Sequence, residues 1–330
     1  MRVLVHGCGG AGVNITAQEI ERLKENTDVF GIVETRYIDT ATADVNEYEF
    51  IPDSDKFIIS SNKLNKNVDG AGGVREALNE FITEDVKNYV DKLDKHSDDI
   101  HIVISSASGG SGSLIAPRLI HTLKMLKLPV IYIMVTDTSS VMYCDNSLKT
   151  AKHIELAGNK YGYSIPTIMI DNKEALDVVN ARVGLQVEQL AILCNGNHKS
   201  LDTTDMTMFA SNAYDKDATG LVSISIHTND SISKISDSFI STLRILTDDR
   251  LFKLDTNVLP KVRQYKQGYP NDAVISRIKE CKLTLPLYFA ITTNNAIVKL
   301  DTIKTDLNKK FKIKEEKKVF FDDDDLGVDI

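Results

Sequence analysis

The stretch that decides the predicted fold is Ser105–Leu119, with the sequence SSASGGSGSLIAPRL. A β-branched run, His101–Ile104, comes before it, and an apolar-periodic segment that predicts a helix runs to Lys127. Glycines between a strand and a helix let backbone N–H groups approach an anion, which then faces the positive end of the helix dipole. The sequence therefore predicts a phosphate-binding loop here.

A second loop of the same kind lies at the N-terminus. The strand is predicted over Met1–His6, the loop over Gly7–Gly12, and the helix over Asn14–Lys24. One glycine-rich turn is weak evidence, because such turns are common. Two of them, each between a strand and a helix, predict one nucleotide that is held from two sides.

The N-terminal loop also fits a dinucleotide-binding turn, since its G-x-G-G-x-G pattern is close to that fingerprint. That alternative requires an acidic residue at the end of the second strand, where Glu34 or Asp39 could serve. It predicts an oxidoreductase that uses a nicotinamide or flavin cofactor and does not need the second glycine loop.

The segment Ser108–Ser113 resembles the signature loop of the tubulin/FtsZ superfamily, which holds the phosphates of GTP. Ser111 stands where the family has threonine, and Leu114 replaces the closing glycine. The resemblance implies a GTPase of that fold, with GTP or GDP and Mg²⁺ as cofactors. The residues that it assigns to the phosphates in this loop are Ser108, Gly109, Gly110, Ser111, Gly112 and Ser113.

The same resemblance assigns roles to the N-terminal loop and to the segment Tyr37–Thr42. Gly9, Gly10 and Gly12 become phosphate contacts, and Asn14 becomes a guanine contact, for which its amide can both donate and accept. In Tyr37–Thr42 the family carries acids near the metal and phosphates. Asp39 matches the first acid, but the third position is Ala41.

Two further loops follow from the resemblance. Asp69–Gly73 resembles the loop that senses the terminal phosphate, with a helix predicted onward through Tyr89. Thr136–Ser147 is predicted as a loop that touches the ribose. The cofactor-binding residues that these loops add are Ala71, Gly72, Gly73, Asp145 and Lys149.

The apolar patterning predicts a parallel α/β sheet and a long helix. Leu128–Val135 is almost continuously apolar, as in a strand buried on both faces, and Ile165–Ile170 and Lys56–Ser60 are further strands. Asp171 and Asn172 are predicted to cap a helix over Lys173–Cys194, about 33 Å long at 1.5 Å per residue. Its apolar surface consists of Leu176, Val179, Val183, Val187, Leu190, Ile192 and Leu193.

By resemblance, this long helix is the family's central helix. Its first part contacts the base, through Asn180 or, in another register, Arg182. The segment after it resembles the family's N-x-D-x-x-D loop, with Ser200 in place of the asparagine and Asp202 and Asp205 as the two acids. These acids are the predicted catalytic residues, acting on the nucleotide of the next subunit. The alternative is a helix cap, with Asp202 as the cap.

The remainder is predicted to form a smaller α/β domain. It contains strands over Gly220–His227 and Leu283–Ile291, and helices over Ile232–Leu246 and Thr293–Phe311. The predicted organisation is a GTP-binding domain over 1–172, a linking helix over 173–195, a catalytic loop and second domain over 196–311, and an acidic tail over 312–330.

The tail combines acids with Leu326, Val328 and Ile330, which a purely solubilising tail does not need. It is predicted to dock on a neighbouring subunit of a head-to-tail homopolymer. Length and tail together most resemble the phage-encoded tubulins, which implies filaments that position phage DNA in a bacterial host. A plasmid-partition filament with a DNA adaptor is the alternative.

Charge and composition bear on nucleic-acid binding, membrane insertion and the cellular compartment. The net charge of −8 argues against a broad nucleic-acid-binding face, and no apolar run approaches the length of a membrane span. The N-terminus enters a strand at once, and Cys8, Cys144, Cys194 and Cys281 have no paired spacing. These features predict a cytoplasmic protein with reduced thiols. Cys194 and His198 have no further ligands nearby, so the metal residues stay unassigned.

Overall fold

The computed structural model describes residues 1–59, 82–195, 198–199, 201–213, 215, 217–227, 239–245, 264–270, 275–276, 287–293 and 296–322. The described strands form one sheet in the order β3-β2-β1-β4-β5-β6-β8-β11-β9-β10-β7. From β3 to β8 all neighbours are parallel, and β11 is antiparallel to both β8 and β9. The predicted parallel α/β sheet joined to a smaller α/β unit is therefore present.

The strands of the sheet have the following bounds. They are β1 (Arg2–Cys8), β2 (Ile32–Asp39), β3 (Lys56–Ile58), β4 (Ile100–Ser106), β5 (Val130–Thr136), β6 (Ser164–Asp171), β7 (His198–Lys199), β8 (Gly220–His227), β9 (Phe239–Ile245), β10 (Gln264–Pro270) and β11 (Leu287–Thr293).

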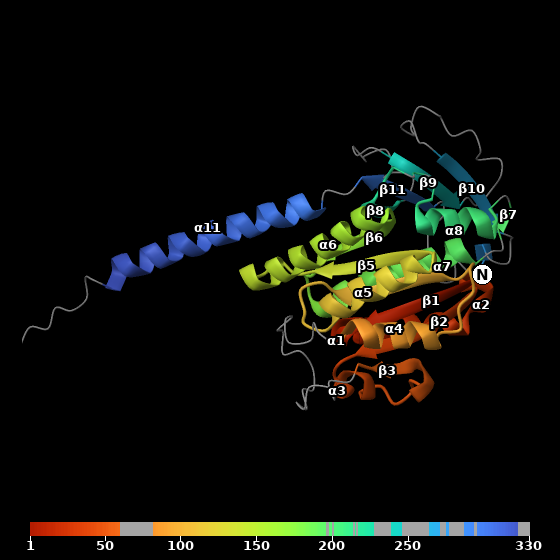
Figure 1. The fold of residues 1–330 in the computed structure, drawn as a ribbon, viewed down its shortest axis with the longest axis horizontal. Helices are drawn as coiled ribbons and strands as arrows, with labels where there is room; N and C mark the ends of the chain where they lie inside the picture. Colours follow the sequence, from red (N-terminus) through yellow and green to blue (C-terminus); the bar gives the residue numbers. More distant parts are fainter. Residues whose placement is uncertain are drawn as a thin grey trace, which may run out of the picture.

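The helices surround this sheet (Figure 1). They are α1 (Gly9–Ile15), the π-helical η1 (Thr16–Ile20), the 3₁₀ segments η2 (Glu21–Glu25) and η3 (Asp53–Asp55), α2 (Thr27–Phe30), α3 (Thr42–Asn46), α4 (Ile82–Lys92), α5 (Gly112–Met125), α6 (Val141–Tyr161), α7 (Leu176–Cys194), α8 (Thr203–Ser211) and α11 (Ala296–Asp322). Among the described residues, no helix is long and apolar enough to span a bilayer.

The strands bury side chains on both faces, which gives the sheet two cores. In β4 and β5 successive residues alternate between them: Ile104 and Ile133 belong to one core, and Val103 and Tyr132 to the other. The first core is covered by α7, and the second by α4, α5 and α6. This two-sided burial explains why the strands read as continuous apolar runs.

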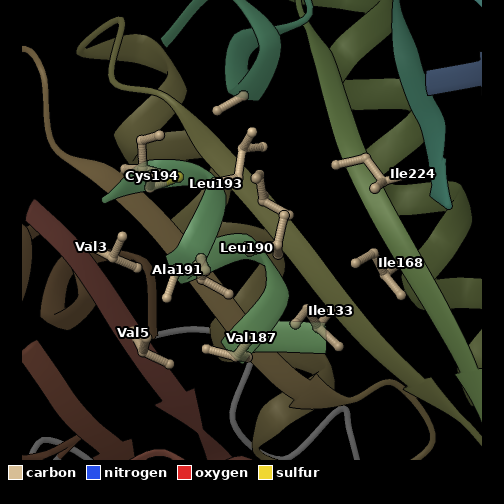
Figure 2. Close-up of a cluster of buried hydrophobic side chains, with 14 of the residues drawn as sticks. Val3, Val5, Ile133, Ile168, Val187, Leu190, Ala191, Leu193, Cys194 and Ile224 are labelled. Atoms are coloured by element: carbon tan, nitrogen blue, oxygen red, sulfur yellow. The ribbon is translucent and has the colours of Figure 1, made fainter. Parts of the chain in front are cut away.

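Helix α7 is the central element of the first core. Figure 2 shows Val187, Leu190 and Ala191 packed between Val3 of β1 and Ile224 of β8. Burial of each such aliphatic side chain contributes about 1.5–3 kcal/mol. Because β8 packs on the same helix as β1, the N-terminal and C-terminal parts of the sheet share one core.

Several predicted boundaries are wrong. Helix α7 begins at Leu176 after Ala175, so Asp171 and Asn172 do not cap it, and Leu176 itself is 63% exposed. Thr136–Ser147 is not a loop throughout, because α6 begins at Val141.

Two differences lie in the C-terminal part. Residues 239–245 of the predicted Ile232–Leu246 helix form β9, because their pairing with β10 and β11 outweighs helical periodicity. The predicted last helix continues past Phe311 to Asp322 as α11, which runs alongside α6 and beyond the body of the molecule (Figure 1). Residues 312–322 of the predicted tail are therefore helical.

A buried histidine pair joins β1 to β4 beneath α4. His6 Nε2 lies 2.9 Å from His101 Nδ1, and His6 Nδ1 lies 2.7 Å from the Tyr89 hydroxyl. Both rings are fully buried. Burial lowers the pKa of His101 to about 4, and burial together with His101 also lowers the pKa of His6.

This pair predicts acid sensitivity. Below the ordinary histidine pKa of 6.5, the unfolded chain takes up protons that folded His101 does not accept until about pH 4. The free energy of unfolding therefore falls across this window, by up to about 1.4 kcal/mol per pH unit for each proton. In urea titrations from pH 7 to 5, His101→Asn should lose less stability than the wild type. The control is His96→Asn, at an exposed histidine, and equal slopes for all three proteins would contradict the assignment.

Candidate functional site

A cavity of about 340 Å³ opens at the carboxyl edge of the parallel strands. It lies beside the position where the strand order reverses, between β1 and β4, which is where open α/β sheets bind ligands. Ser106 ends β4, Val135 lies near the end of β5, and Asn172 follows β6. The full lining is Gly10, Ala11, Asn14, Ile15, Asp44, Ser106, Val135, Asn172, Leu176, Val179 and Asn180.

The two predicted glycine loops meet backbone to backbone beside this cavity. Gly9 has a φ of +72°, and a Cβ there would lie 2.7 Å from the Cα of Gly112. A Cβ on Gly112 would in turn lie 2.7 Å from the carbonyl oxygen of Cys8. Only glycine permits this approach, so the beginnings of α1 and α5 lie side by side. The N-terminal loop is also shorter than predicted, because β1 continues to Cys8 and α1 begins at Gly9.

The loop before α5 is held by its own hydroxyls and by α6. Ser113 Oγ donates to the carbonyl of Gly110 at 2.9 Å, and Ser108 Oγ is 2.9 Å from Ser106 Oγ. Asn146 of α6 donates to the carbonyl of Ser108 at 3.0 Å. The loop therefore leads into the N-terminus of a 14-residue helix, which favours an anion.

The acidic side of the site is formed by Asp39, at the end of β2, and Asp44 of α3. Asp39 is buried, and its Oδ1 accepts from the backbone N–H of Thr40 at 2.6 Å. Its Oδ2 finds no hydrogen-bond partner in the described part of the chain. Burial and the adjacent Asp44 carboxyl raise the pKa of Asp39 to about 7.

This region contains oxygen ligands that suit Mg²⁺. The Thr40 hydroxyl lies 2.6 Å from that of Ser111, which links the Asp39 segment to the loop before α5. Asp44 Oδ2 lies next to Gly10, 2.5 Å from where a Cβ on Gly10 would stand. Carboxylate and hydroxyl oxygens are the ligands that this hard cation prefers, so Asp39, Asp44 and Ser111 fit a nucleotide-bound Mg²⁺.

The opposite wall carries amides and apolar side chains. Asn14 of α1, Asn172 and Asn180 of α7 line the cavity, together with Val179 and Leu176. This combination of flat apolar surface and amide groups suits a purine base. Of the two predicted registers on α7, Asn180 reaches the cavity, whereas Arg182 is exposed and pairs with Glu174 at 2.7 Å.

Of the predicted nucleotide contacts, Gly10, Asn14 and Asn180 line the cavity, whereas Asp39 and the Ser108–Ser113 loop do not. Asp145 and Lys149, which also do not line it, are on α6, 3.0 Å apart, and Asp145 pairs with Lys304 of α11. Ala71, Gly72 and Gly73 lie outside the described residues.

The predicted catalytic acids lie at the other end of α7. Asp202 is the N-cap of α8, and its side chain accepts from the Asp205 backbone N–H at 2.9 Å. The capping geometry is therefore present. Asp202 is exposed, and Asp205 is 9% exposed.

The C-terminal end of α7 and the helix α8 lie at the amino edge of the sheet. Asn195, which follows α7, donates to the carbonyl of Val29 just before β2, and Ser211 of α8 accepts from Ser164 at the start of β6. The cavity lies at the carboxyl edge, so α7 spans the depth of the sheet, about 28 Å. In Figure 1, α3 lies at the lower left of the body of the molecule and α8 at its right side.

Sequence reasoning missed Asp44, Ser106 and Asn172 in the lining. Asn172 and Ser106 come where predicted strands end, so the rule that ligands bind at the carboxyl edge could have identified them. Asp44 does not follow a predicted strand end directly, so this rule could not have identified it. It lies on α3, five positions after Asp39, and of these two acids only Asp44 lines the cavity.

Cys194 and His198 belong to no cluster of three metal-binding side chains in the part of the chain that the structure describes. His198 Nε2 lies 2.7 Å from the carbonyl of Ile192. Within the described ranges no group of three metal-binding side chains occurs, and the cysteines found there, Cys8, Cys144 and Cys194, are free.

The fold and this cavity define a nucleotide-binding α/β protein. Residues 2–180 match the family described as "Tubulin/FtsZ family, GTPase domain". Since the match covers more than half of the chain, the protein belongs to the tubulin/FtsZ family.

Among its relatives are two phage tubulin-like proteins. That of Pseudomonas phage 201phi2-1 is 26% identical over 43% of this chain and 45% of its own length. That of Pseudomonas phage phiKZ is 28% identical over 64% of this chain and 63% of its own. These matches therefore span about half to two thirds of each curated relative.

Solved structures share the fold over nearly the whole chain. The protofilament of TubZ from bacteriophage PhiKZ has a TM-score of 0.75 at 22% identity, covering 96% of this chain and 92% of that one. The phage tubulin PhuZ with GDP has a TM-score of 0.76 at 18% identity, covering 94% and 92%. At these identities the likeness establishes the fold.

A substitution pair tests the contact between the glycine loops. Gly9 and Gly162 have nearly the same φ, +72° and +70°, but a Cβ on Gly162 would meet nothing within 4 Å. Gly162→Ala should lower the free energy of unfolding by about 1 kcal/mol, the cost of the left-handed conformation. Gly9→Ala should lower it by about 1–3 kcal/mol more, because its methyl group overlaps the backbone of Gly112. Equal losses in urea denaturation would refute the contact.

Proposed function

We propose that this chain is a GTPase that assembles head to tail into filaments, in which each subunit completes the hydrolytic site of its neighbour. GTP and Mg²⁺ bind in the cavity at the carboxyl edge. The observation that carries the proposal is the length of α7, which separates the cavity from Asp202 and Asp205. Acids at the far end of a rigid helix cannot reach phosphates bound in their own subunit, but a stacked copy brings them there.

In the proposed filament, one subunit binds the nucleotide and the next subunit supplies the acids for hydrolysis. In one subunit, the glycines and hydroxyls around Gly9, Gly112 and Ser111 bind the phosphates of the GTP. Asp202 and Asp205 of the next subunit orient the attacking water and accept its proton. Mg²⁺ supplies charge neutralisation at the phosphates. Asp202 is exposed and presents its carboxylate to the neighbour directly.

Resemblance to phage tubulins supports the cellular role. Two phage proteins are among the relatives, so we propose that the filament positions phage DNA in the cytoplasm of a bacterial host. The net charge of −8 favours cargo attachment through an adaptor rather than by direct contact with nucleic acid.

Substitution of the acids tests hydrolysis in trans. Asp205→Ala should bind GTP and polymerise, while phosphate release falls about a hundredfold or more. Asp202→Ala also removes a helix cap worth about 1 kcal/mol, whereas Asp202→Asn retains a good cap and removes only the charge. Hydrolysis should therefore fall in Asp202→Asn without a loss of stability.

The dependence of GTP turnover on protein concentration provides a second test of hydrolysis in trans. Wild-type GTP turnover per subunit should rise sharply above a threshold protein concentration, since the site is complete only in the polymer. A rate strictly proportional to protein concentration, or normal turnover in Asp205→Ala, would contradict the proposal. Turnover of ATP, measured in the same way, tests whether the site prefers GTP.

A groove on α6 is the proposed acceptor for the tail of a neighbouring subunit. It has a volume of about 520 Å³, and its apolar floor includes Leu156, which is 67% exposed. The lining residues are Lys149, Lys152, His153, Leu156, Ala157, Lys160 and Tyr161. Residues 323–330 carry acids interleaved with Leu326, Val328 and Ile330, so their charge and apolar content complement this groove.

Truncation after Asp322 removes this segment and leaves α11 complete. It should raise the critical concentration for assembly, measured by light scattering and pelleting, at least about threefold, and Lys160→Glu should do the same. If the tail docks in this groove, the truncated protein should be insensitive to Lys160→Glu, since the two changes remove one contact. Additive effects would place the tail elsewhere, and unchanged assembly after truncation would refute docking.

A further inference from the structure

Four polar side chains form a continuous hydrogen-bonded chain across the base side of the cavity. Asn180 Nδ2 donates to Gln18 Oε1 at 3.3 Å, and Gln18 Nε2 donates to the Tyr48 hydroxyl at 2.9 Å. Tyr48 in turn donates to Asn14 Oδ1 at 3.3 Å. Both ends of the chain, Asn14 and Asn180, line the cavity, whereas Gln18 and Tyr48 do not.

The backbone is shaped to allow these contacts. Gln18 lies in η1, where five residues adopt π-helical geometry, a wider turn that often accompanies functional sites. This turn packs on α7 at Gly184, where a Cβ would lie only 2.9 Å from Glu19 Cβ. The close packing brings η1 within reach of Asn180, one turn earlier on α7. Tyr48 comes from the segment after α3.

These hydrogen bonds leave each of the two asparagines with one amide group, an acceptor or a donor, that is available to a ligand. Asn180 uses its NH₂ on Gln18, and its Oδ1 is buried with no hydrogen-bond partner within the described part of the protein. A buried acceptor without a donor is costly, so Oδ1 requires a donor from whatever fills the cavity. Asn14 uses its Oδ1 on Tyr48 and keeps its NH₂ as a donor.

We propose that Gln18 and Tyr48 are positioning residues that fix the amides of Asn14 and Asn180 in the orientation that selects guanine over adenine; the inference rests on the proposed function. Guanine carries N–H donors at N1 and N2 and an acceptor at O6, which match one acceptor and one donor on the protein. Adenine reverses this pattern, with a donor at N6 and an acceptor at N1. A site with fixed amides rejects the wrong base because its buried polar groups are then left unpaired.

The test measures base selectivity rather than overall affinity. Dissociation constants for GDP and ADP are determined below the assembly threshold, and their ratio is compared between variants. Gln18→Leu breaks two of the three links, those to Asn180 and to Tyr48, so the preference for GDP should fall about tenfold or more. Tyr48→Phe removes the two links that its hydroxyl makes, to Gln18 and to Asn14, but leaves Asn180 bonded to Gln18, and the preference should fall about three- to tenfold.

The controls separate positioning from general damage. Gln186→Leu makes the same exchange at a glutamine of α7 whose side chain, among the described residues, bonds only within its own helix, to Gln189 at 3.4 Å, and it should keep the wild-type ratio. Affinity for inorganic pyrophosphate should stay unchanged in every variant, because the phosphate loops are untouched.

The outcomes distinguish this inference from the proposed function. A wild-type protein that binds neither nucleotide contradicts both. A wild type that prefers GDP, with Gln18→Leu retaining a ratio within twofold of it, overturns the positioning role alone. Equal wild-type affinity for GDP and ADP also overturns it.

Discussion

The structure depends on the contact between two glycine backbones at one edge of the sheet. Gly9 and Gly112 lie so close that no side chain fits between them, which brings the first turns of α1 and α5 together. β1 and β4 are neighbours in the sheet, and they deliver these turns to the same edge because they are parallel. The sheet, its register and its two cores hold this pair of helix N-termini in place, so an anion bound beside them faces both helix dipoles.

Helix α7 extends that local arrangement to the scale of the whole molecule. Its apolar residues pack on β1, β5, β6 and β8, so the helix cannot shift without disturbing the core that the two parts of the sheet share (Figure 2). One end supplies Asn180 to the cavity, and the other leads to α8 and its capping acid. The length of α7 therefore separates the cavity from Asp202 and Asp205 by about 28 Å.

The sequence predicted most of this architecture, because its strongest signals are chemical. Continuous apolar runs identified the parallel strands, and glycines between strand and helix located the cavity. It failed where tertiary context decides, since residues 239–245 have helical periodicity but pair as β9. Asp44 and the link from Gln18 to Asn180 depend on residues far apart in sequence, and a pattern along one chain cannot reveal them.

Helix α6 shows how a residue predicted for one role can serve another. Its inner face supports the loop before α5, through Asn146 on Ser108 and through Thr150, whose hydroxyl donates to the carbonyl of Ala107 at 2.9 Å. Its outer face pairs with α11, through Asp145 with Lys304, and carries the groove around Leu156. The loop geometry and the direction in which the C-terminal helix leaves the body are therefore fixed by one straight element. Helix α6 therefore braces the loop before α5 on one side and α11 on the other.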